Sequence, residues 1–191
     1  MRRRAVSRSL LLLLATFSIL GCAAKRTVYL DRQADFESVR RVAVLPFQNM
    51  TKDSFAGEKV RRIFIIELLA QEVVEVVDPG EVALVLREQR IDDVESMGPE
   101  KIATLAEAMK VDALIFGSVQ ELGLDRSRQV SSAQVSITCR MLDAGTGAPL
   151  WSAAASRGGA GAMSRLFGVS GDTVSEAARK MVRQVIKTLV D

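Results

Sequence analysis

Residues 41–47, with the sequence RVAVLPF, decide the predicted fold. An uninterrupted apolar run that ends at a proline is typical of a strand that is buried on both faces. Runs of similar character recur at residues 73–77 and 113–119. Helical patterns separate the three runs, after residue 54 up to about residue 70, from Pro79 with Asp78 as the N-cap, and after Pro99. Strands that alternate with helices indicate an α/β domain with a parallel sheet.

The second half of the chain has a different pattern. Apolar and polar residues alternate over residues 134–141, as in an amphipathic antiparallel strand. Residues 143–148 form a turn signal, and residues 150–154 return as the hairpin partner. Thr173 and Glu176 form a capping box that opens a final helix. We therefore predict one α/β domain over residues 41–191, with a mixed sheet, parallel early and antiparallel in its C-terminal hairpin, flanked by helices.

Residues 1–21 are typical of an export signal and are not expected to belong to the fold. The apolar stretch from Leu10 to Leu20 is too short for a membrane-spanning helix, which needs ~20 residues, and suits a signal peptide. Basic residues precede it, namely Arg2, Arg3, Arg4 and Arg8.

The signal ends in a pattern that resembles a lipobox. Ile19, Leu20 and Gly21 precede Cys22, as expected where a peptidase cuts before a cysteine that carries lipid on its sulfur. Several acyl chains on one residue anchor a protein stably to a membrane. Ala23 after the cysteine implies sorting to the outer membrane, on its periplasmic face. The alternatives are ordinary secretion with a cut after Ala24, and an uncleaved anchor helix.

Residues 22–40 are predicted to be the lipidated cysteine and a short polar tether, with some order as an alternative near Val28 to Leu30. The 18 residues from Ala23 to Arg40 extend at most ~65 Å, at ~3.3–3.6 Å per residue. The domain is therefore expected to stay near its membrane.

The charge balance argues against nucleic acid as a partner. The whole chain has 26 Lys and Arg and 23 Asp and Glu, but four of the basic residues lie in the signal. The remaining 170 residues carry 22 basic and 23 acidic side chains, so they lack the excess positive charge of a nucleic-acid footprint.

The residue types needed for common catalytic and metal sites are missing. The chain has no histidine, which excludes histidine-based triads and imidazole metal sites. If Cys22 carries lipid, Cys139 has no partner for a disulfide, and it is interpreted as a core residue. Glu67, within an apolar helix, either has a perturbed pKa, faces outward or pairs with an arginine. We expect no enzyme activity, no metal and no cofactor other than the lipid on Cys22.

Three residues are candidates for contact with a partner. Trp151, the only tryptophan, is interpreted as a cap on the core near the hairpin turn, with a binding hot spot as the alternative. Arg126 and Arg128 form a small basic pair that surface solvation explains and that an acidic patch on a partner would also use.

Several segments, in the same order, resemble the CsgG-like and LpoB-like bacterial lipoproteins, whose fold resembles the TolB N-terminal domain. The matching segments are VAVLPFQNMT at 42–51, VVD at 76–78, VLREQ at 85–89, VDALIFGSV at 111–119, MLDAGTG at 141–147 and LW at 150–151. The resemblance covers about residues 41–190.

The resemblance implies two different roles. CsgG-like channels insert β-hairpins into the outer membrane, with ~9–11 alternating residues per strand. Residues 120–131 are too short for such a hairpin, and residues 156–171 are rich in glycine, so we expect no pore. LpoB-like proteins reach a penicillin-binding protein through a long linker, which the short tether here does not match.

The predicted function is a non-catalytic, outer-membrane-anchored module that binds another protein in envelope assembly or secretion. The alternative is an LpoB-like activator of a penicillin-binding protein in peptidoglycan synthesis. Homo-oligomers are a further expectation, because the CsgG branch forms rings.

Overall fold

Strand β2, Arg41–Val44, lies in the middle of the parallel part of the sheet and is buried on both faces. Val42 and Val44 belong to one hydrophobic cluster, and Ala43 and Leu45 belong to the other. Alternate side chains of a strand point to opposite faces, so an apolar run without polar interruption is what two covered faces require. These data come from a computed structural model that describes residues 25–31, 36–125, 132–158 and 172–190.

The elements follow one another in the order β-η-β-β-α-β-α-α-β-β-β-α. Their bounds are β1 Lys25–Leu30, η1 Phe36–Ser38 (a 3-10 helix), β2 Arg41–Val44, β3 Gln48–Asn49, α2 Ala56–Leu69, β4 Glu75–Val76, α3 Pro79–Glu88, α4 Pro99–Met109, β5 Ala113–Asp125, β6 Ser132–Asp143, β7 Pro149–Arg157 and α6 Val174–Val190.

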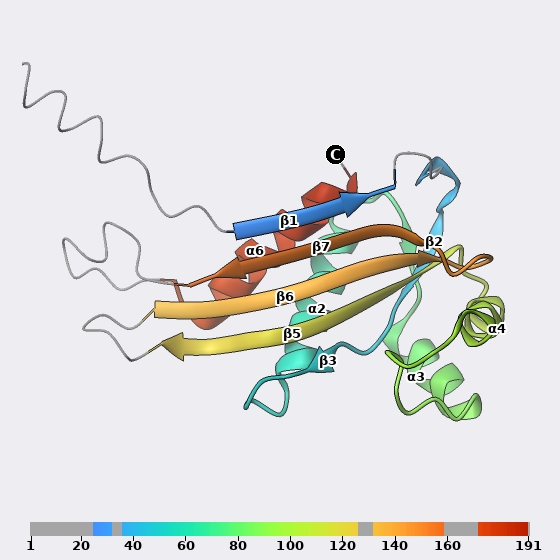
Figure 1. The fold of residues 1–191 in the computed structure, drawn as a ribbon, viewed down its shortest axis with the longest axis horizontal. Coiled ribbons are helices and arrows are strands. Elements are labelled where there is room, and N and C mark those ends of the chain that lie inside the picture. Colours follow the sequence, from blue (N-terminus) through green and yellow to red (C-terminus); the bar gives the residue numbers. More distant parts are fainter. Residues whose placement is uncertain (1–24, 32–35, 126–131, 159–171, 191) are drawn as a thin grey trace, which may run out of the picture.

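One sheet contains all seven described strands, in the order β1-β7-β6-β5-β2-β4, with β3 beside β5 (Figure 1). Strands β2, β3, β4 and β5 pair in parallel, whereas β5, β6, β7 and β1 pair in antiparallel fashion. The predicted α/β class and the mixed sheet, parallel early and antiparallel late, are confirmed.

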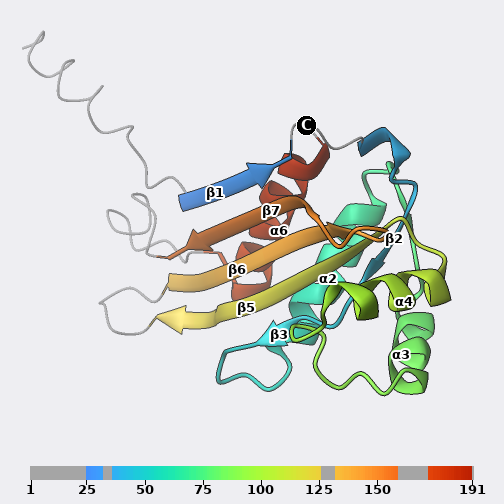
Figure 2. The ribbon, with the colours of Figure 1, turned by 45° about the vertical axis from the view of Figure 1, so that its right-hand side comes forward.

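Helices cover the two faces unequally. Helices α2 and α6 pack against each other and cover one face along its length, whereas α3 and α4 lie at the parallel end of the other face (Figure 2). Strand β6 accordingly buries Val135, Ile137, Cys139 and Met141 on the α2–α6 side and alternates with more exposed, polar residues. A continuous apolar run in the sequence thus marks a strand with both faces covered, and an alternating pattern marks a strand with one face covered.

Strand β1 differs from the sequence prediction. Lys25–Leu30 were expected to lie in a tether, but they pair with β7 along its length, from Lys25 opposite Ser156 to Leu30 opposite Trp151. The described side chains of β1 are all exposed, so the segment lacks the burial pattern that identifies a strand in a sequence. Phe36–Ser38, also in the expected tether, form η1, and Phe36 packs on the core.

Two predicted helix starts are confirmed by their hydrogen bonds. The Asp78 carboxylate accepts from the Gly80 backbone N–H at 2.7 Å, with Pro79 in the first turn of α3. At the start of α6, Thr173 Oγ1 accepts from the Glu176 N–H at 3.2 Å, and Glu176 Oε2 accepts from the Thr173 N–H at 2.9 Å. This reciprocal pair is the predicted capping box, and it lowers the pKa of Glu176.

The phenylalanine that ends the RVAVLPF stretch requires a glycine in β5. The Phe47 ring lies over Gly117, where an added Cβ would stand 2.5 Å from Cζ and 2.6 Å from Cε1. The same ring meets Phe64 of α2 edge to face, with centroids 5.6 Å apart. Gly117 thus makes room for the ring that joins β5 to α2.

We predict that Gly117→Ala destabilises the domain by about 1–3 kcal/mol, the usual cost of overpacking a core. Urea unfolding followed by circular dichroism measures this. In a Phe47→Ala background the ring is gone, so the same glycine substitution is expected to cost less than about 1 kcal/mol. Equal costs in both backgrounds would contradict the close contact.

Candidate functional site

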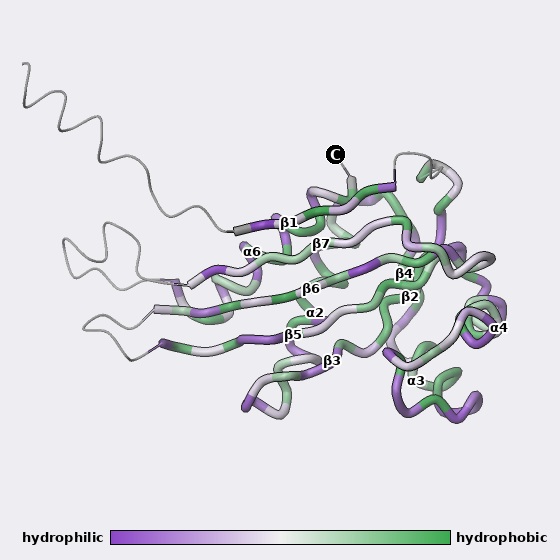
Figure 3. The backbone as a smooth tube through the Cα atoms, in the orientation of Figure 1, coloured by the Kyte–Doolittle hydropathy of each residue, from purple (hydrophilic) through white to green (hydrophobic). Residues whose placement is uncertain are grey.

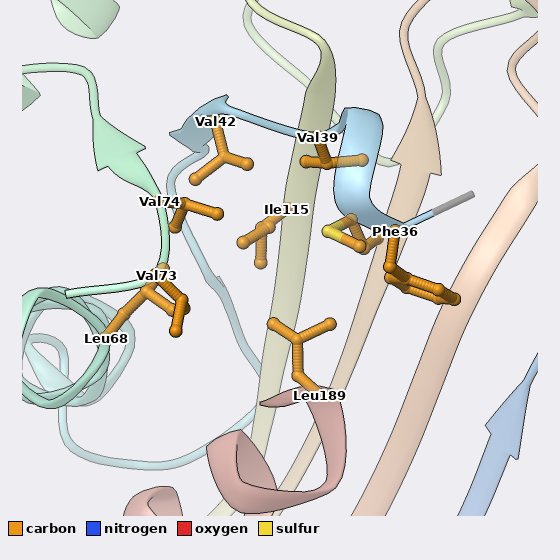
Figure 4. Close-up of a pocket in the computed structure, with 9 residues that line it drawn as sticks. Phe36, Val39, Val42, Leu68, Val73, Val74, Ile115 and Leu189 are labelled. Carbon is orange, nitrogen blue, oxygen red and sulfur yellow. The ribbon is translucent and has the colours of Figure 1, made fainter. Parts of the chain in front are cut away.

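An apolar pocket opens between the C-terminal ends of α2 and α6. Figure 4 shows its side chains converging from both helices, from η1 and from the sheet beneath. Nine residues line it, all apolar: Phe36, Val39, Val42, Leu68, Val73, Val74, Ile115, Met141 and Leu189. The pocket is the uncovered end of the main hydrophobic cluster, since all of these residues except Val73 either belong to that cluster or lie at its margin.

The size and lining of the pocket limit what it can hold. Its volume is about 280 Å³, slightly below the ~300–1,000 Å³ that is usual for small-molecule sites. Such sites also contain a few polar groups that orient the ligand, and no polar side chain lines this pocket. An apolar side chain or two fits this chemistry better than a metabolite.

Exposed apolar residues lie at the pocket and in the chain segment just before it. Val73 lines the pocket and is 53% exposed, while Ile66 and Leu69 lie on the preceding helix, α2, 63% and 50% exposed. Scattered exposed apolar side chains are normal on protein surfaces. Here they lie within one stretch of chain that leads into an apolar pocket, which is a typical property of an interaction surface.

The buried arginine in the core serves the backbone. Arg61 of α2 donates from Nε and Nη2 to the Val44 carbonyl, at 3.1 and 2.7 Å, just where β2 ends. Burial is the main influence on the Arg61 guanidinium and lowers its pKa, while Glu58 opposes the shift. Arg61 is therefore a structural residue that satisfies a buried carbonyl.

Glu67, the carboxylate noted in the sequence, is also fully paired. Arg183 of α6 donates to both of its oxygens, at 2.9 and 3.2 Å, and Arg179 lies 3.9 Å away. The hydrogen bond to Glu67 raises the pKa of Arg183. Among the interpretations left open for Glu67, pairing with an arginine is the one observed, and it connects α2 to α6.

Trp151 lies in the core. Its side chain is completely buried, and Nε1 donates to Thr188 Oγ1 of α6 at 3.1 Å. The interpretation as a core residue holds, and the alternative of a partner-contact residue is corrected, because the ring presents no surface to a partner.

The remaining predicted site residues lie outside the described residues. These are Ile19, Leu20, Gly21, Cys22, Ala23, Arg126 and Arg128. The sequence did not single out the pocket, because its lining residues follow ordinary core patterns and Phe36 was assigned to the tether.

Within the described parts of the chain, no cluster of three or more metal-ligating side chains occurs. The helices of the same parts are too short or too polar for any of them to cross a membrane.

Comparison with models of protein families assigns the chain to a family. The model described as "Putative lipoprotein GNA1162-like" matches residues 34–191. The chain belongs to this family. The GNA1162-like match covers the whole described sheet except β1, together with η1 and all four α-helices. Among curated proteins, none matches the sequence.

Solved structures share the fold at low sequence identity. The PelC dodecamer from Paraburkholderia phytofirmans has a TM-score of 0.62 and 20% identity, over 87% of this chain and 97% of that one. Lipoprotein GNA1162 from Neisseria meningitidis has a TM-score of 0.58 and 20% identity, over 79% and 98%. The LpoB C-terminal domain from Salmonella enterica has a TM-score of 0.51 and 13% identity, over 66% and 89%.

These comparisons confirm the LpoB-like part of the predicted resemblance as a likeness of fold. The CsgG-like part stays a prediction.

We predict that Cys139 does not react with maleimide in the folded protein. Burial raises the pKa of its thiol far above the usual value, and the side chain has no exposed surface. Labelling followed by mass spectrometry should show modification of Cys139 only after unfolding in urea. Rapid labelling under native conditions would contradict the core position.

Proposed function

We propose that this protein is a non-catalytic lipoprotein, anchored through acylated Cys22 to the periplasmic face of the outer membrane. Through the apolar pocket it binds an apolar segment of another envelope protein. The observation that carries the proposal is a pocket of side-chain size, without polar side chains, at the end of the sheet opposite the proposed anchored end.

The anchor lies close to the fold. Only Ala23 and Ala24 separate Cys22 from β1, so the lipidated residue is within ~10 Å of the first strand, at ~3.3–3.6 Å per residue. This distance replaces the ~65 Å reach expected from a tether over residues 23–40. The domain is held directly at the membrane, and a partner has to come to it.

The pocket faces away from the anchored end. Its sheet residues Ile115 and Met141 lie in the row that continues through Trp151 to Leu30, the last residue of β1. Lys25, where the chain enters the sheet, is five residues back along the strand, or ~17 Å at ~3.4 Å per residue. A partner in the periplasm can therefore reach the pocket without competing with the membrane.

An apolar anchor residue on the partner accounts for the chemistry. Burial of one large apolar side chain contributes about 1.5–3 kcal/mol, and such residues, inserted into well-packed pockets, dominate many protein interfaces. Val73, which lines the pocket and is exposed, would contact the inserted side chain.

The LpoB-like fold supports a second candidate, in which the partner is a penicillin-binding protein. The short connection between Cys22 and β1 argues against this role, because a partner in the inner membrane would have to cross most of the periplasm. Identification of the partner separates the two candidates.

Self-association is also part of the proposal. The fold neighbour from P. phytofirmans is a dodecamer, and a protein held on a membrane meets other copies at a raised effective concentration.

We predict that Cys22→Ser abolishes metabolic labelling with palmitate and releases the protein from the membrane fraction. The substitution removes the sulfur that would carry the lipid and leaves the described fold unchanged. Cys139→Ser, which also removes a thiol, should keep the label. A Cys22→Ser protein that still takes up palmitate would overturn the anchoring.

We predict that a photo-crosslinking amino acid at position 73 captures one envelope protein in intact cells. The same amino acid at position 84 is the matched control, because Leu84 is also exposed, at 44%, but lies on α3, away from the pocket. Mass spectrometry of the adduct identifies the partner, and a penicillin-binding protein there would favour the second candidate.

A pocket-filling variant tests whether the pocket itself binds. Val74→Trp should lower capture at position 73 by about 30-fold, the equivalent of losing an anchor of about 2 kcal/mol. Unchanged capture in a folded Val74→Trp protein would show that the pocket is not the binding site.

A further inference from the structure

The outer edge of β1 is an open strand edge. Strand β1 is the terminal strand of the sheet, and no described strand pairs with its outer side (Figure 1). It contains no proline, and Val28, Tyr29 and Leu30 are all exposed, at 40–51%. Figure 3 shows this apolar stretch on the rim of the sheet. Proteins usually protect such edges with charges, proline or bulges, because an open apolar edge pairs with other strands.

The outer part of β5 is a second open edge. Strands β2 and β3 pair with β5 only as far as Val119, and residues 120–125 pair with β6 alone among the described strands. Beyond β3, residues 51–55 form a turn held by the Asn49 side chain and leave this edge. Leu124 on this segment is 48% exposed. The antiparallel half of the sheet is thus a four-stranded unit with open edges on both sides.

The backbone groups of β1 that face outward can be assigned from its pairing. The Asp31 N–H donates to the Leu150 carbonyl, and these residues are opposite each other in the register. Hydrogen-bonded and non-hydrogen-bonded pairs alternate in antiparallel sheets. The N–H and C=O groups of Arg26, Val28 and Leu30 therefore point away from β7.

The same reasoning applies to β5. The Val119 carbonyl accepts from the Met50 N–H on the outer side, and a bulge between Val119 and Glu121 shifts the pattern by one residue. Leu122 and Leu124 consequently direct their backbone groups outward.

The side chains of the two edges also match. Leu30 is opposite the buried Trp151, and Leu122 is opposite the buried Val135, so both point toward the α6 side of the sheet. On each edge, the residues with outward backbone groups are the residues that face α6. Val28 and Leu30 would therefore lie beside Leu122 and Leu124 when the two edges pair.

The charges are complementary in sequence. Strand β1 begins with Lys25 and Arg26 and has no acidic residue, whereas residues 120–125 contain Glu121 and Asp125 and no basic residue. When β1 and β5 pair in antiparallel fashion, the basic N-terminal end of β1 lies beside the acidic C-terminal end of β5.

We propose that β1 of one copy adds to the outer edge of β5 in a second copy, and that this antiparallel pairing joins copies head to tail. Strands β1, β7, β6 and β5 alternate in direction, so a new β1 beside β5 continues the alternation. Repetition of this heterologous contact gives a ring if the rotation closes.

The head-to-tail arrangement places every anchored end on one side of the assembly. All copies point their β1 in the same direction, as one membrane requires. Pairing of β1 with β1 would instead set the two N-termini at opposite ends of a six-residue strand, ~20 Å apart. The argument from direction rests on the proposed anchoring through Cys22, whereas the pairing of the edges does not.

Engineered disulfides test the pairing. In the full-length chain in its host membrane, Val28→Cys is combined with Leu122→Cys or with Leu124→Cys, to allow for a register shift of two residues. Directly opposed residues are ~5.5 Å apart between Cα atoms, within disulfide reach. We expect at least one combination to give a ladder of covalent oligomers on non-reducing gels.

The matched control combines Tyr29→Cys with the same β5 variants. Tyr29 is equally exposed but points to the opposite face of the sheet, so the ladder should be absent or at least about tenfold weaker, as expected for groups that point apart. No ladder with either Val28 combination, or an equal ladder with Tyr29, would overturn the proposal. So would strong dimers from Val28→Cys alone, which would indicate pairing of β1 with β1.

A second variant tests the hydrogen bonds. Val28→Pro removes an outward N–H, a change that edge strands tolerate, and it should weaken self-association about tenfold, as expected for one lost hydrogen bond. Val28→Thr keeps the N–H and should associate like the wild type in sedimentation of the detergent-solubilised protein. The near-ultraviolet signal of Trp151 checks that each variant is folded, and equal association of both variants would contradict the proposal.

Palmitate labelling of Cys22 separates this inference from the proposed function. A disulfide ladder in a protein that takes up no palmitate would support the strand pairing and overturn the anchoring. Palmitate on Cys22 without a disulfide ladder would support the anchoring and overturn the strand pairing.

Discussion

The burial of β2 and the start of β5 on both faces is the constraint on which the remaining structure depends. Helices α2 and α6 cover one side, and α3 and α4 cover the other, so this end of the sheet contributes side chains to both hydrophobic clusters. Water cannot reach the carbonyl groups at a buried strand end, so they need hydrogen-bond donors from the protein. Arg61 donates to the Val44 carbonyl at the end of β2, shortly before Pro46. Phe47 then crosses Gly117 to meet α2. The RVAVLPF stretch therefore contacts both β5, at Gly117, and α2, through Arg61 and Phe64.

The opposite end of the sheet is built differently. There the strands are antiparallel, only α6 and α2 cover them, and both lateral edges are open among the described residues. Such a sheet can leave one face in water at little cost, but open edges retain unpaired backbone groups. The molecule therefore has a rigid two-sided half that forms the pocket, and a one-sided half whose edges suit contacts between copies.

In the proposed anchoring, the position of β1 links these halves to the membrane. Because β1 begins three residues after Cys22, a lipid on that cysteine would lie close to the fold. In the proposed arrangement the anchored end, the open edges and the pocket have separate places, so anchoring, self-association and partner binding do not compete for one surface.

The sequence by itself determined the α/β class, the change from parallel to antiparallel pairing, and the helix starts at Asp78 and Thr173, because each depends on local periodicity or on hydrogen bonds within a few residues. The tertiary structure alone decided that Lys25–Leu30 form a strand and that Trp151 is inaccessible, because an exposed edge strand has no burial pattern and a tryptophan beside a turn can face either way. It also decided where the pocket lies. Core positions have the same sequence pattern whether a neighbouring element covers them or not, so only the packing of α2, α6 and η1 shows that this end of the core stays open.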